Sequence, residues 1–183
     1  MTRPVVGLAR TTTAGSDTRR AALTLHITGA VQGVGFRPAV ARLARSLGLD
    51  GLVANDPAGV TVKLEGPPGA LEEFVARLPG EAPAAANLED CRRRDAAPRG
   101  AQGFVIAASR ADGECRPALG PDVATCPRCL AEVLDPRDRR HRHVFASCAQ
   151  CGPRFSLVEA LPFDRERTTM TDFAPCAACV RVF

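Results

Sequence analysis

The chain has 183 residues, 45% of them hydrophobic but only 4% aromatic, and its formal net charge is +4. No stretch approaches the ~18 apolar residues of a membrane-spanning helix, so we do not expect an integral membrane protein. The lack of Trp and Tyr argues against a nucleic-acid binder that stacks bases on aromatic side chains. Lys63 is the only lysine among 24 basic residues; this arginine bias is compatible with phosphate ligands and equally with a genome-wide preference for arginine.

Residues 1–20 are rich in Thr, Gly, Ser and Arg without apolar periodicity, and we predict a flexible tail there. A twin-arginine signal is not indicated, because His26 interrupts the apolar run after Arg20 and no small-residue cleavage site follows. Six of the eight cysteines form C-x-x-C pairs, a pattern typical of metal sites in reducing compartments. We therefore expect a cytoplasmic protein.

Residues 21–109 show the patterns of a small α+β domain. Alternating apolar residues over 23–27 predict a strand, and apolar residues at helical spacing over 36–47 predict a helix. A hairpin is predicted over residues 50–64. A second amphipathic helix follows, and we expect it to stop at Pro79-Gly80.

Two more strands complete the predicted domain, a weak polar one at residues 87–94 and a clearer one at 104–108. The resulting order is strand–helix–strand–strand–helix–strand with one extra edge strand. This is the split βαβ, or ferredoxin-like, arrangement, in which both helices pack on one face of an antiparallel sheet. A linker over residues 110–124, with its Gly and Pro residues, then leads to a cysteine-rich segment over 125–183.

A glycine-rich turn joins the first predicted strand to the first helix: Gln32-Gly33-Val34-Gly35-Phe36-Arg37. Glycines let such a turn direct several backbone N–H groups toward one concave surface, and the helix N-terminus adds its own free amides. The planar guanidinium of Arg37 can hold two oxygens of a phosphate. The turn is therefore a candidate cradle for a tetrahedral anion; the alternative is a purely structural turn with a solvated Arg37.

The domain resembles the acylphosphatase signature in stretches that keep its order and spacing: Val31–Arg37, Leu47–Leu49, Gly51–Asn55 and Gly59–Val62. The resemblance implies that the turn and Arg37 hold the phosphate of an acyl phosphate, and that Asn55 orients the attacking water. An acyl phosphate already has a good leaving group, so charge neutralisation and the placement of one water can carry most of the reaction. Without the resemblance, Asn55 is a plain turn residue beside Asp56-Pro57.

Two knuckles in the cysteine-rich segment, Cys126-Pro127-Arg128-Cys129 and Cys148-Ala149-Gln150-Cys151, are separated by 18 residues. This spacing is typical of a zinc ion held by four thiolates. A redox pair is disfavoured because no thioredoxin-like βαβ pattern surrounds either knuckle, and a pair of disulfides is the other alternative. Four sulfurs leave the metal no open position, so we expect structural zinc.

A third pair, Cys176 and Cys179, follows 24 residues later and has no partner pair before the chain ends at Phe183. It is a candidate half-site for a second metal. His141 and His143 could complete it, although the neighbouring arginines favour solvated surface histidines. In another alternative, the third pair replaces one of the first two around the same metal.

The cysteine-rich segment resembles the zinc-finger region of HypF-type carbamoyltransferases, which mature [NiFe]-hydrogenases, in five stretches: Pro121–Cys126, Asp135–Arg140, Cys148–Phe155, Ala160–Arg165 and Thr168–Phe173. The resemblance implies a fourth C-x-x-C after residue 183. It also implies nucleotide-binding and kinase-like domains that transfer a carbamoyl group to a cysteine of a partner maturation protein. The ending Cys179–Phe183 departs from the family pattern, so we expect an N-terminal fragment without the complete transferase activity.

These patterns and resemblances predict an enzyme that binds and hydrolyses an acyl phosphate, with carbamoyl phosphate as the favoured substrate and zinc as its cofactor. The alternative is a non-catalytic binding or assembly module that carries the same zinc finger. The net charge of +4 is too small to favour nucleic acid as a partner, and no membrane partner is expected.

Overall fold

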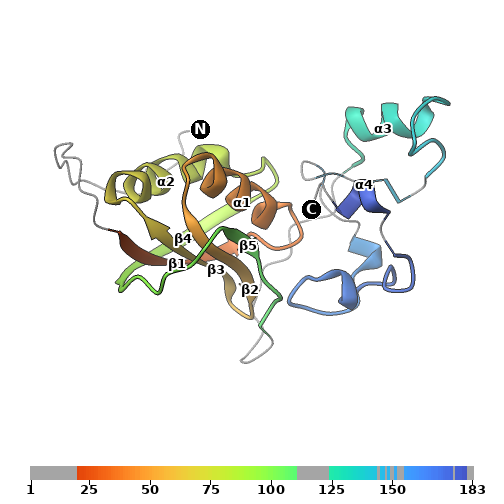
Figure 1. The fold of residues 1–183 in the computed structure, drawn as a ribbon. Helices are drawn as coiled ribbons and strands as arrows, with labels where there is room; N and C mark the ends of the chain where they lie inside the picture. Colours follow the sequence, from red (N-terminus) through yellow and green to blue (C-terminus); the bar gives the residue numbers. More distant parts are fainter. Residues whose placement is uncertain are drawn as a thin grey trace, which may run out of the picture.

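The computed structural model describes residues 20–110, 124–143, 145, 146, 148, 151, 155–174 and 176–180. Nearly all of the predicted tail and of the predicted linker lies outside the described residues. Figure 1 shows a sheet covered by two helices and, beside one end of it, the cysteine-rich segment. In the ranges that the structure describes, none of the helices has the length and apolar character needed to cross a membrane.

Five strands form one sheet in the order β4-β1-β3-β2-β5. Their bounds are β1 Ala21–Ala30, β2 Asp50–Asp56, β3 Gly59–Gly66, β4 Asn87–Ala96 and β5 Phe104–Ile106. The first four strands pair antiparallel in the ferredoxin-like order, which confirms the predicted fold. The short β5 is the extra edge strand, and it pairs in parallel with β2, a direction that the sequence pattern did not predict.

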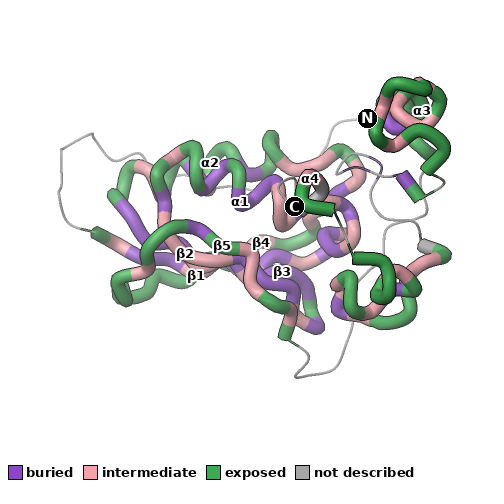
Figure 2. Tube along the Cα trace, turned by 45° about the vertical axis from the view of Figure 1, so that its right-hand side comes forward, coloured by how far each residue is buried: buried purple, intermediate pink, exposed green. Residues whose placement is uncertain are grey.

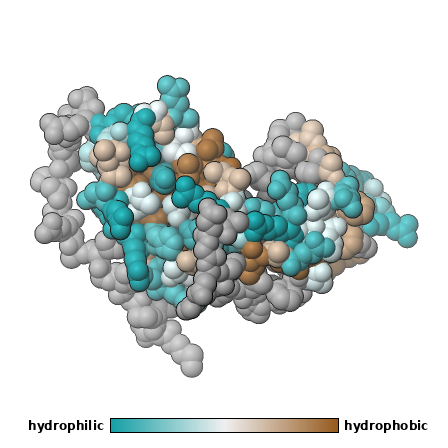
Figure 3. All heavy atoms as spheres, turned by 90° about the horizontal axis from the view of Figure 1, so that it is seen from below, coloured by the Kyte–Doolittle hydropathy of each residue, from teal (hydrophilic) through white to brown (hydrophobic). Residues whose placement is uncertain are grey.

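Helices α1 (Phe36–Ser46) and α2 (Pro68–Glu81) lie side by side on one face of the sheet (Figure 1). Their buried faces meet the inward side chains of β1 and β3, so the core lies between the helices and the sheet (Figure 2). Full burial of one such aliphatic side chain stabilises the fold by about 1.5–3 kcal/mol. In the view from below, hydrophilic side chains prevail over hydrophobic ones (Figure 3).

Helix α2 extends beyond its predicted end at Pro79-Gly80 and finishes at Glu81. A proline in a helix removes one backbone donor and disturbs the preceding turn. Here the proline lies in the last turn, and Ala82 N still donates to Leu78 O at 3.1 Å. The helix therefore continues one residue past the predicted stop, because a proline in the last turn leaves this closing hydrogen bond intact.

The described residues of the cysteine-rich segment form α3 (Pro127–Leu134), α4 (Ala177–Val180) and two 3-10 turns at Phe155–Leu157 and Arg165–Arg167. An isolated bridge between Val158 and Thr168 connects the two 3-10 turns. The buried cluster of this segment consists of cysteines, Cys129, Cys148 and Cys151. Among the described residues of this segment, no larger apolar core is present, and a cluster of cysteine sulfurs takes its place.

Candidate functional site

The glycine-rich turn between β1 and α1 adopts a conformation that requires glycine at two positions. Gly33 has φ 72° and Gly35 has φ 75°, both in the left-handed region. Gly35 caps α1, and its carbonyl accepts from Ala39 N at 3.2 Å. In the part of the chain that the structure describes, the backbone N–H groups of Gly33, Val34 and Gly35 donate to no protein acceptor. The turn therefore offers the free donors of an anion nest, next to the positive end of a helix.

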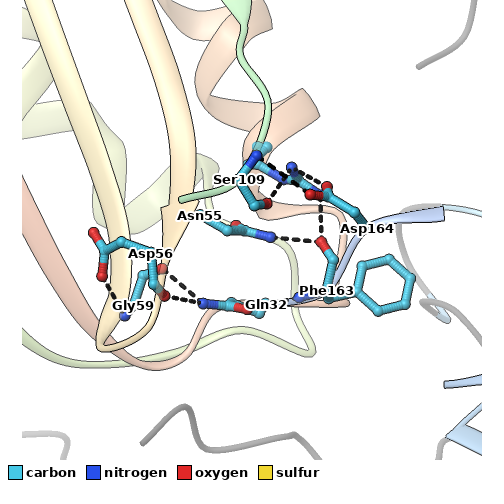
Figure 4. Close-up of polar contacts among 8 residues, drawn as sticks. Gln32, Asn55, Asp56, Gly59, Ser109, Phe163 and Asp164 are labelled. Atoms are coloured by element: carbon cyan, nitrogen blue, oxygen red, sulfur yellow. Dashed lines mark hydrogen bonds and ion pairs between the residues drawn. The ribbon is translucent and has the colours of Figure 1, made fainter. Parts of the chain in front are cut away.

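Gln32 braces this turn against the β2–β3 hairpin (Figure 4). Its side chain is buried, and Nε2 donates to Asp56 O and to Gly59 O, both at 2.8 Å. Its Oε1 accepts from Phe163 N at 3.0 Å. Both amide hydrogens are thus used within the protein, so the Gln32 side chain holds the turn in place and leaves anion binding to the backbone.

The hairpin that receives Gln32 is itself fixed by the Asp56 carboxylate. Asp56 Oδ1 accepts from Ala58 N and Gly59 N at 2.9 Å, and Oδ2 accepts from Thr61 Oγ1 at 2.6 Å. Burial alone would raise the pKa of Asp56, but these donors and His26 outweigh it and lower the pKa. The carboxylate therefore keeps the end of β2, where Asn55 lies, in one conformation.

Arg37 extends from the first turn of α1 into contact with the cysteine-rich segment. Its side chain is only 15% exposed, which contradicts the alternative of a solvated arginine. Nη1 donates to Asp164 Oδ1 at 2.7 Å and Nη2 to Phe163 O at 2.8 Å. Ser109 also lies here: its Oγ is 3.4 Å from Arg37 Nη1, and its N–H donates to Asp164 Oδ2 at 3.3 Å.

Asn55 is fully buried at the end of β2 and is not a plain turn residue. Its Nδ2 donates to Phe163 O at 2.8 Å, the same oxygen that accepts from Arg37 (Figure 4). Its Oδ1 is buried and has no hydrogen-bond partner among the described residues. A buried carbonyl oxygen left unpaired costs about 1–3 kcal/mol, which marks this atom as an acceptor for a bound water or ligand.

The structure thus brings together the two side chains predicted from the sequence, because Arg37 and Asn55 bind one common oxygen beside the glycine-rich turn. It adds three residues that sequence reasoning missed: Ser109, Phe163 and Asp164. Phe163 and Asp164 lie in Ala160–Arg165, a stretch that supported only the family resemblance. No spacing rule connects that stretch to residue 37, since the contacts span 126 and 127 positions.

The first two cysteine knuckles meet in a compact cluster. The four sulfurs of Cys126, Cys129, Cys148 and Cys151 lie within 4.8 Å of one another. Three of their separations are 3.6 Å (126–148), 3.8 Å (129–151) and 3.9 Å (148–151). A tetrahedron of sulfurs around a zinc ion at about 2.3 Å has edges of about 3.8 Å. The donor set and its spacing therefore fit a zinc ion.

The protonation of this cluster also suits a metal. Burial, followed by hydrogen bonds from the neighbouring sulfurs, raises the pKa of the Cys129 thiol. Burial acts in the same direction on Cys151, but backbone N–H groups of Cys126 and Cys148 outweigh it and lower the pKa of Cys151. Deprotonation is therefore easier at Cys151 than at Cys129, and a divalent cation would displace the protons of the thiols, as zinc does on binding them.

The third pair stands apart from this cluster. Cys176 is exposed, with Arg139 Nη1 at 3.5 Å from its Sγ, and the side chain of Cys179 lies outside the described residues. His143 packs edge-on against Phe145, with ring centroids 6.3 Å apart. Within the described ranges, neither His141, His143 nor Cys176 joins a group of three or more metal-binding side chains.

Two protein families match the chain: acylphosphatase over residues 23–106 and the HypF finger over residues 125–158. The carbamoyltransferase HypF2 of Cupriavidus necator is 47% identical over 160 residues, which cover 86% of this chain and 20% of that protein. An acylphosphatase of Nocardioides sp. is 41% identical over 88 residues, covering 48% of this chain and 88% of that protein.

A solved structure, described as full-length HypF in the phosphate- and nucleotide-bound form, superposes with a TM-score of 0.83 at 36% identity. It covers 92% of this chain and 22% of that one, so the chain spans about a fifth of the HypF proteins that it matches. Both predicted resemblances are confirmed. The chain belongs to the acylphosphatase family through its sheet domain and, with the HypF finger that follows, corresponds to the N-terminal part of HypF-type carbamoyltransferases.

Proposed function

We propose that the chain binds an acyl phosphate at the turn over residues 32–37 and hydrolyses it, with carbamoyl phosphate as the substrate. The observation that carries this proposal is the meeting of Arg37 and Asn55 at one oxygen, beside a turn whose amides are free. Acylphosphatases supply the class of reaction, and the carbamoyltransferase relatives supply the choice of acyl group.

The phosphoryl group would be held by the N–H groups of Gly33, Val34 and Gly35 together with the Arg37 guanidinium. Backbone amides at a helix N-terminus and a forked cation are both suited to phosphate oxygens. They neutralise the charge on those oxygens, which otherwise repels an incoming nucleophile. In a site this sheltered from solvent, such fixed donors supply the largest part of the catalytic effect.

Asn55 would position the water. Its buried Oδ1 accepts a hydrogen from the water, so that a lone pair of the water oxygen faces phosphorus. The P–O bond to the acyl group then breaks, and the products are inorganic phosphate and the free carboxylate, or carbamate when carbamoyl phosphate is the substrate. Because a carboxylate is a good leaving group, no strong general acid is needed.

We assign Cys126, Cys129, Cys148 and Cys151 as the ligands of one structural zinc ion. The ion would hold α3 and the second knuckle together and takes no part in hydrolysis, because four sulfurs complete its coordination. Cys176 and Cys179 remain a proposed half-site for a second metal. Metal-binding C-x-x-C knuckles are characteristic of a reducing compartment, which supports a cytoplasmic location.

Complete transfer of a carbamoyl group is not assigned to these residues. Relatives that carry this name are about five times as long as the matched region, since it covers 20% of them. We propose that this chain hydrolyses carbamoyl phosphate to phosphate and carbamate. In complete relatives, further domains would activate the carbamate and pass it to a partner maturation protein.

The test is hydrolysis of benzoyl phosphate, acetyl phosphate and carbamoyl phosphate by the full chain. We expect the wild type to hydrolyse these substrates. Arg37→Ala should lower the turnover by about 100-fold or more, because it removes a main donor that stabilises the phosphoryl charge. Arg42→Ala is the matched control, because Arg42 is an exposed arginine on the same helix. An inactive wild type would favour the alternative of a non-catalytic binding or assembly module.

A further inference from the structure

We propose that Phe163 and Asp164 of the cysteine-rich segment complete the acyl-phosphate site by positioning Arg37 and Asn55. This inference rests on the proposed function, and it makes the site a joint product of both parts of the chain. Arg37 donates its two short hydrogen bonds to Phe163 O and to the Asp164 carboxylate. Asn55 Nδ2 donates to the same Phe163 O. The two residues are called the positioning pair below.

The Phe163 peptide is held on both sides. Its N–H donates to Gln32 Oε1 at 3.0 Å, and its carbonyl oxygen accepts from Arg37 Nη2 and Asn55 Nδ2, each at 2.8 Å (Figure 4). Gln32 in turn is bonded to the hairpin that carries Asn55. One oxygen therefore fixes the separation of the two side chains that the reaction uses, and the glycine-rich turn is part of the same network.

For Asn55, the consequence is the orientation of its amide. A backbone carbonyl can only accept, so the Asn55 side chain presents Nδ2 to Phe163 O and keeps Oδ1 on the other side. Oδ1 is the atom left buried and unpaired in the described chain. Phe163 thus selects which end of the amide meets the water. An Asn55 free to rotate would offer a donor in half of its orientations and would hold the water less productively.

For Arg37, the consequence is the loss of rotational freedom before substrate arrives. Arginine is among the side chains that lose the most rotamer entropy on ordering. Asp164 and Phe163 O together engage one N–H on each Nη atom, and Ser109 N–H holds the second oxygen of the Asp164 carboxylate. A guanidinium has five N–H groups, so donors remain for the phosphoryl oxygens. The positioning pair therefore orients the Arg37 guanidinium and leaves some of its N–H groups available to bind phosphate.

The opposite interpretation is that Asp164 occupies the anion site as an internal competitor. A competitor for that site would accept from the nest amides, as a phosphate does. In the described residues, the Asp164 carboxylate bonds to Arg37 and Ser109, and not to Gly33, Val34 or Gly35. The nest stays open while the arginine is held, which favours positioning over competition.

The two interpretations predict opposite changes in phosphate affinity, which calorimetry with inorganic phosphate measures on the full chain. Asp164→Ala should weaken phosphate binding about tenfold, since a charged hydrogen-bond partner of Arg37 is lost. Asp164→Asn, which keeps the shape and loses the charge, should give an intermediate value. Asp172→Asn, an exposed carboxylate in the same segment, is the control and should match the wild type. KM for acyl phosphate should follow the phosphate affinity, with an unchanged melting temperature.

Phosphate binding that is unchanged or tighter in both Asp164 variants would overturn the inference; tighter binding would identify an internal competitor. Because binding is measured without turnover, the two proposals fail separately. A wild type whose phosphate affinity depends on Asp164 but that hydrolyses nothing contradicts only the proposed hydrolysis. A wild type that hydrolyses acyl phosphate while the Asp164 variants match it contradicts only the positioning role. A wild type that binds no phosphate contradicts both.

Discussion

The sheet domain and the cysteine-rich segment are stabilised by different means. The sheet domain buries a continuous apolar core that includes Leu23, Leu25 and Ile27 of β1 and Phe74 of α2. In the cysteine-rich segment, the buried cluster consists of cysteines, and most of the described residues are exposed (Figure 2). The first therefore draws its stability from the hydrophobic effect, whereas the proposed zinc ion would stabilise the second.

The difference matters because the candidate site uses both. The glycine-rich turn and Asn55 belong to the apolar domain, whereas Phe163 and Asp164 lie in the segment that also carries the cysteine cluster. Loss of the proposed zinc ion should therefore lower acyl-phosphate hydrolysis without unfolding the sheet domain. Changes in the apolar core should act on the whole domain.

The largest effect is expected from loss of the metal. Cys129→Ser should release zinc and unfold the cysteine-rich segment, because structural zinc contributes on the order of 10 kcal/mol to such a module. The sheet domain should keep its amide protection, while acyl-phosphate hydrolysis falls as the positioning pair leaves Arg37. Zinc content, hydrogen exchange and kcat/KM are the measurements. Cys176→Ser is the control and should retain the zinc; equal zinc loss in both variants would show that the third pair takes part in the same site.

Truncation of a buried apolar side chain should lower the stability of the sheet domain. Leu25→Ala removes a fully buried side chain from the centre of β1 and should lower the free energy of unfolding of the sheet domain by about 3 kcal/mol. Val105→Ala, at a half-exposed position of β5, should change it far less. Urea unfolding of the zinc-loaded chain measures both. Zinc content should be unaffected, and a parallel loss of zinc would show that the two parts fold as one unit.

Glu65 should make the stability of the sheet domain depend on pH in the acidic range. It is 7% exposed, and its carboxylate accepts from the N–H groups of Arg99, Gly100 and Ala101 at 2.9–3.1 Å. Burial would raise the pKa of Glu65, but these donors lower it below the ordinary value of 4.5. A lowered folded pKa means that the stabilisation is complete above pH 4.5 and is lost as pH falls through the folded pKa.

Glu65→Gln should accordingly destabilise the domain by about 2 kcal/mol at neutral pH and flatten the fall in stability below pH 4.5. Urea midpoints measured from pH 3 to pH 7 test both parts of this prediction. Asp50 and Asp56, whose pKa values are also lowered, should preserve some acid sensitivity in the variant. An unchanged pH profile in Glu65→Gln would contradict the assignment.

The smallest effect on stability is expected at the glycine-rich turn. Gly35→Ala places a Cβ at φ 75° and should cost about 1 kcal/mol, because L residues are strained in the left-handed region. Gly80→Ala is the matched control: this glycine lies in α2 with open space around it, so alanine should stabilise the domain slightly. Thermal unfolding should therefore shift in opposite directions for the two variants, and equal shifts would contradict a strained turn.

Local patterns predicted most of the sheet domain. Alternating and helical periodicities predicted β1, α1 and the β2–β3 hairpin, and two glycines with Arg37 indicated the glycine-rich turn as a candidate anion site. The end of α2 was wrong because a stop signal does not say how the last turn will close. The parallel pairing of β5 depends on which edge of the sheet is free, and that is decided by the whole fold.

The candidate site was predictable only from its own domain. Arg37 and Asn55 lie in stretches with a recognisable spacing, whereas Phe163 and Asp164 lie in an irregular stretch without apolar periodicity. Asp164 directly precedes the 3-10 turn at Arg165–Arg167, and its contact with Arg37 depends on how the folded segment directs the chain. Such a tertiary contact has no local signature, and the unpaired Asn55 Oδ1 becomes visible only once side chains are placed.

The most direct test of the central claim is a phosphate titration followed by backbone amide NMR of the full chain. If the turn is an anion nest, the amide resonances of Gly33, Val34 and Gly35 should shift together as phosphate binds, and Arg37→Ala should abolish the shift. The account is contradicted if these three resonances stay in place at saturating phosphate, or if the shifts appear elsewhere on the chain and survive the loss of Arg37.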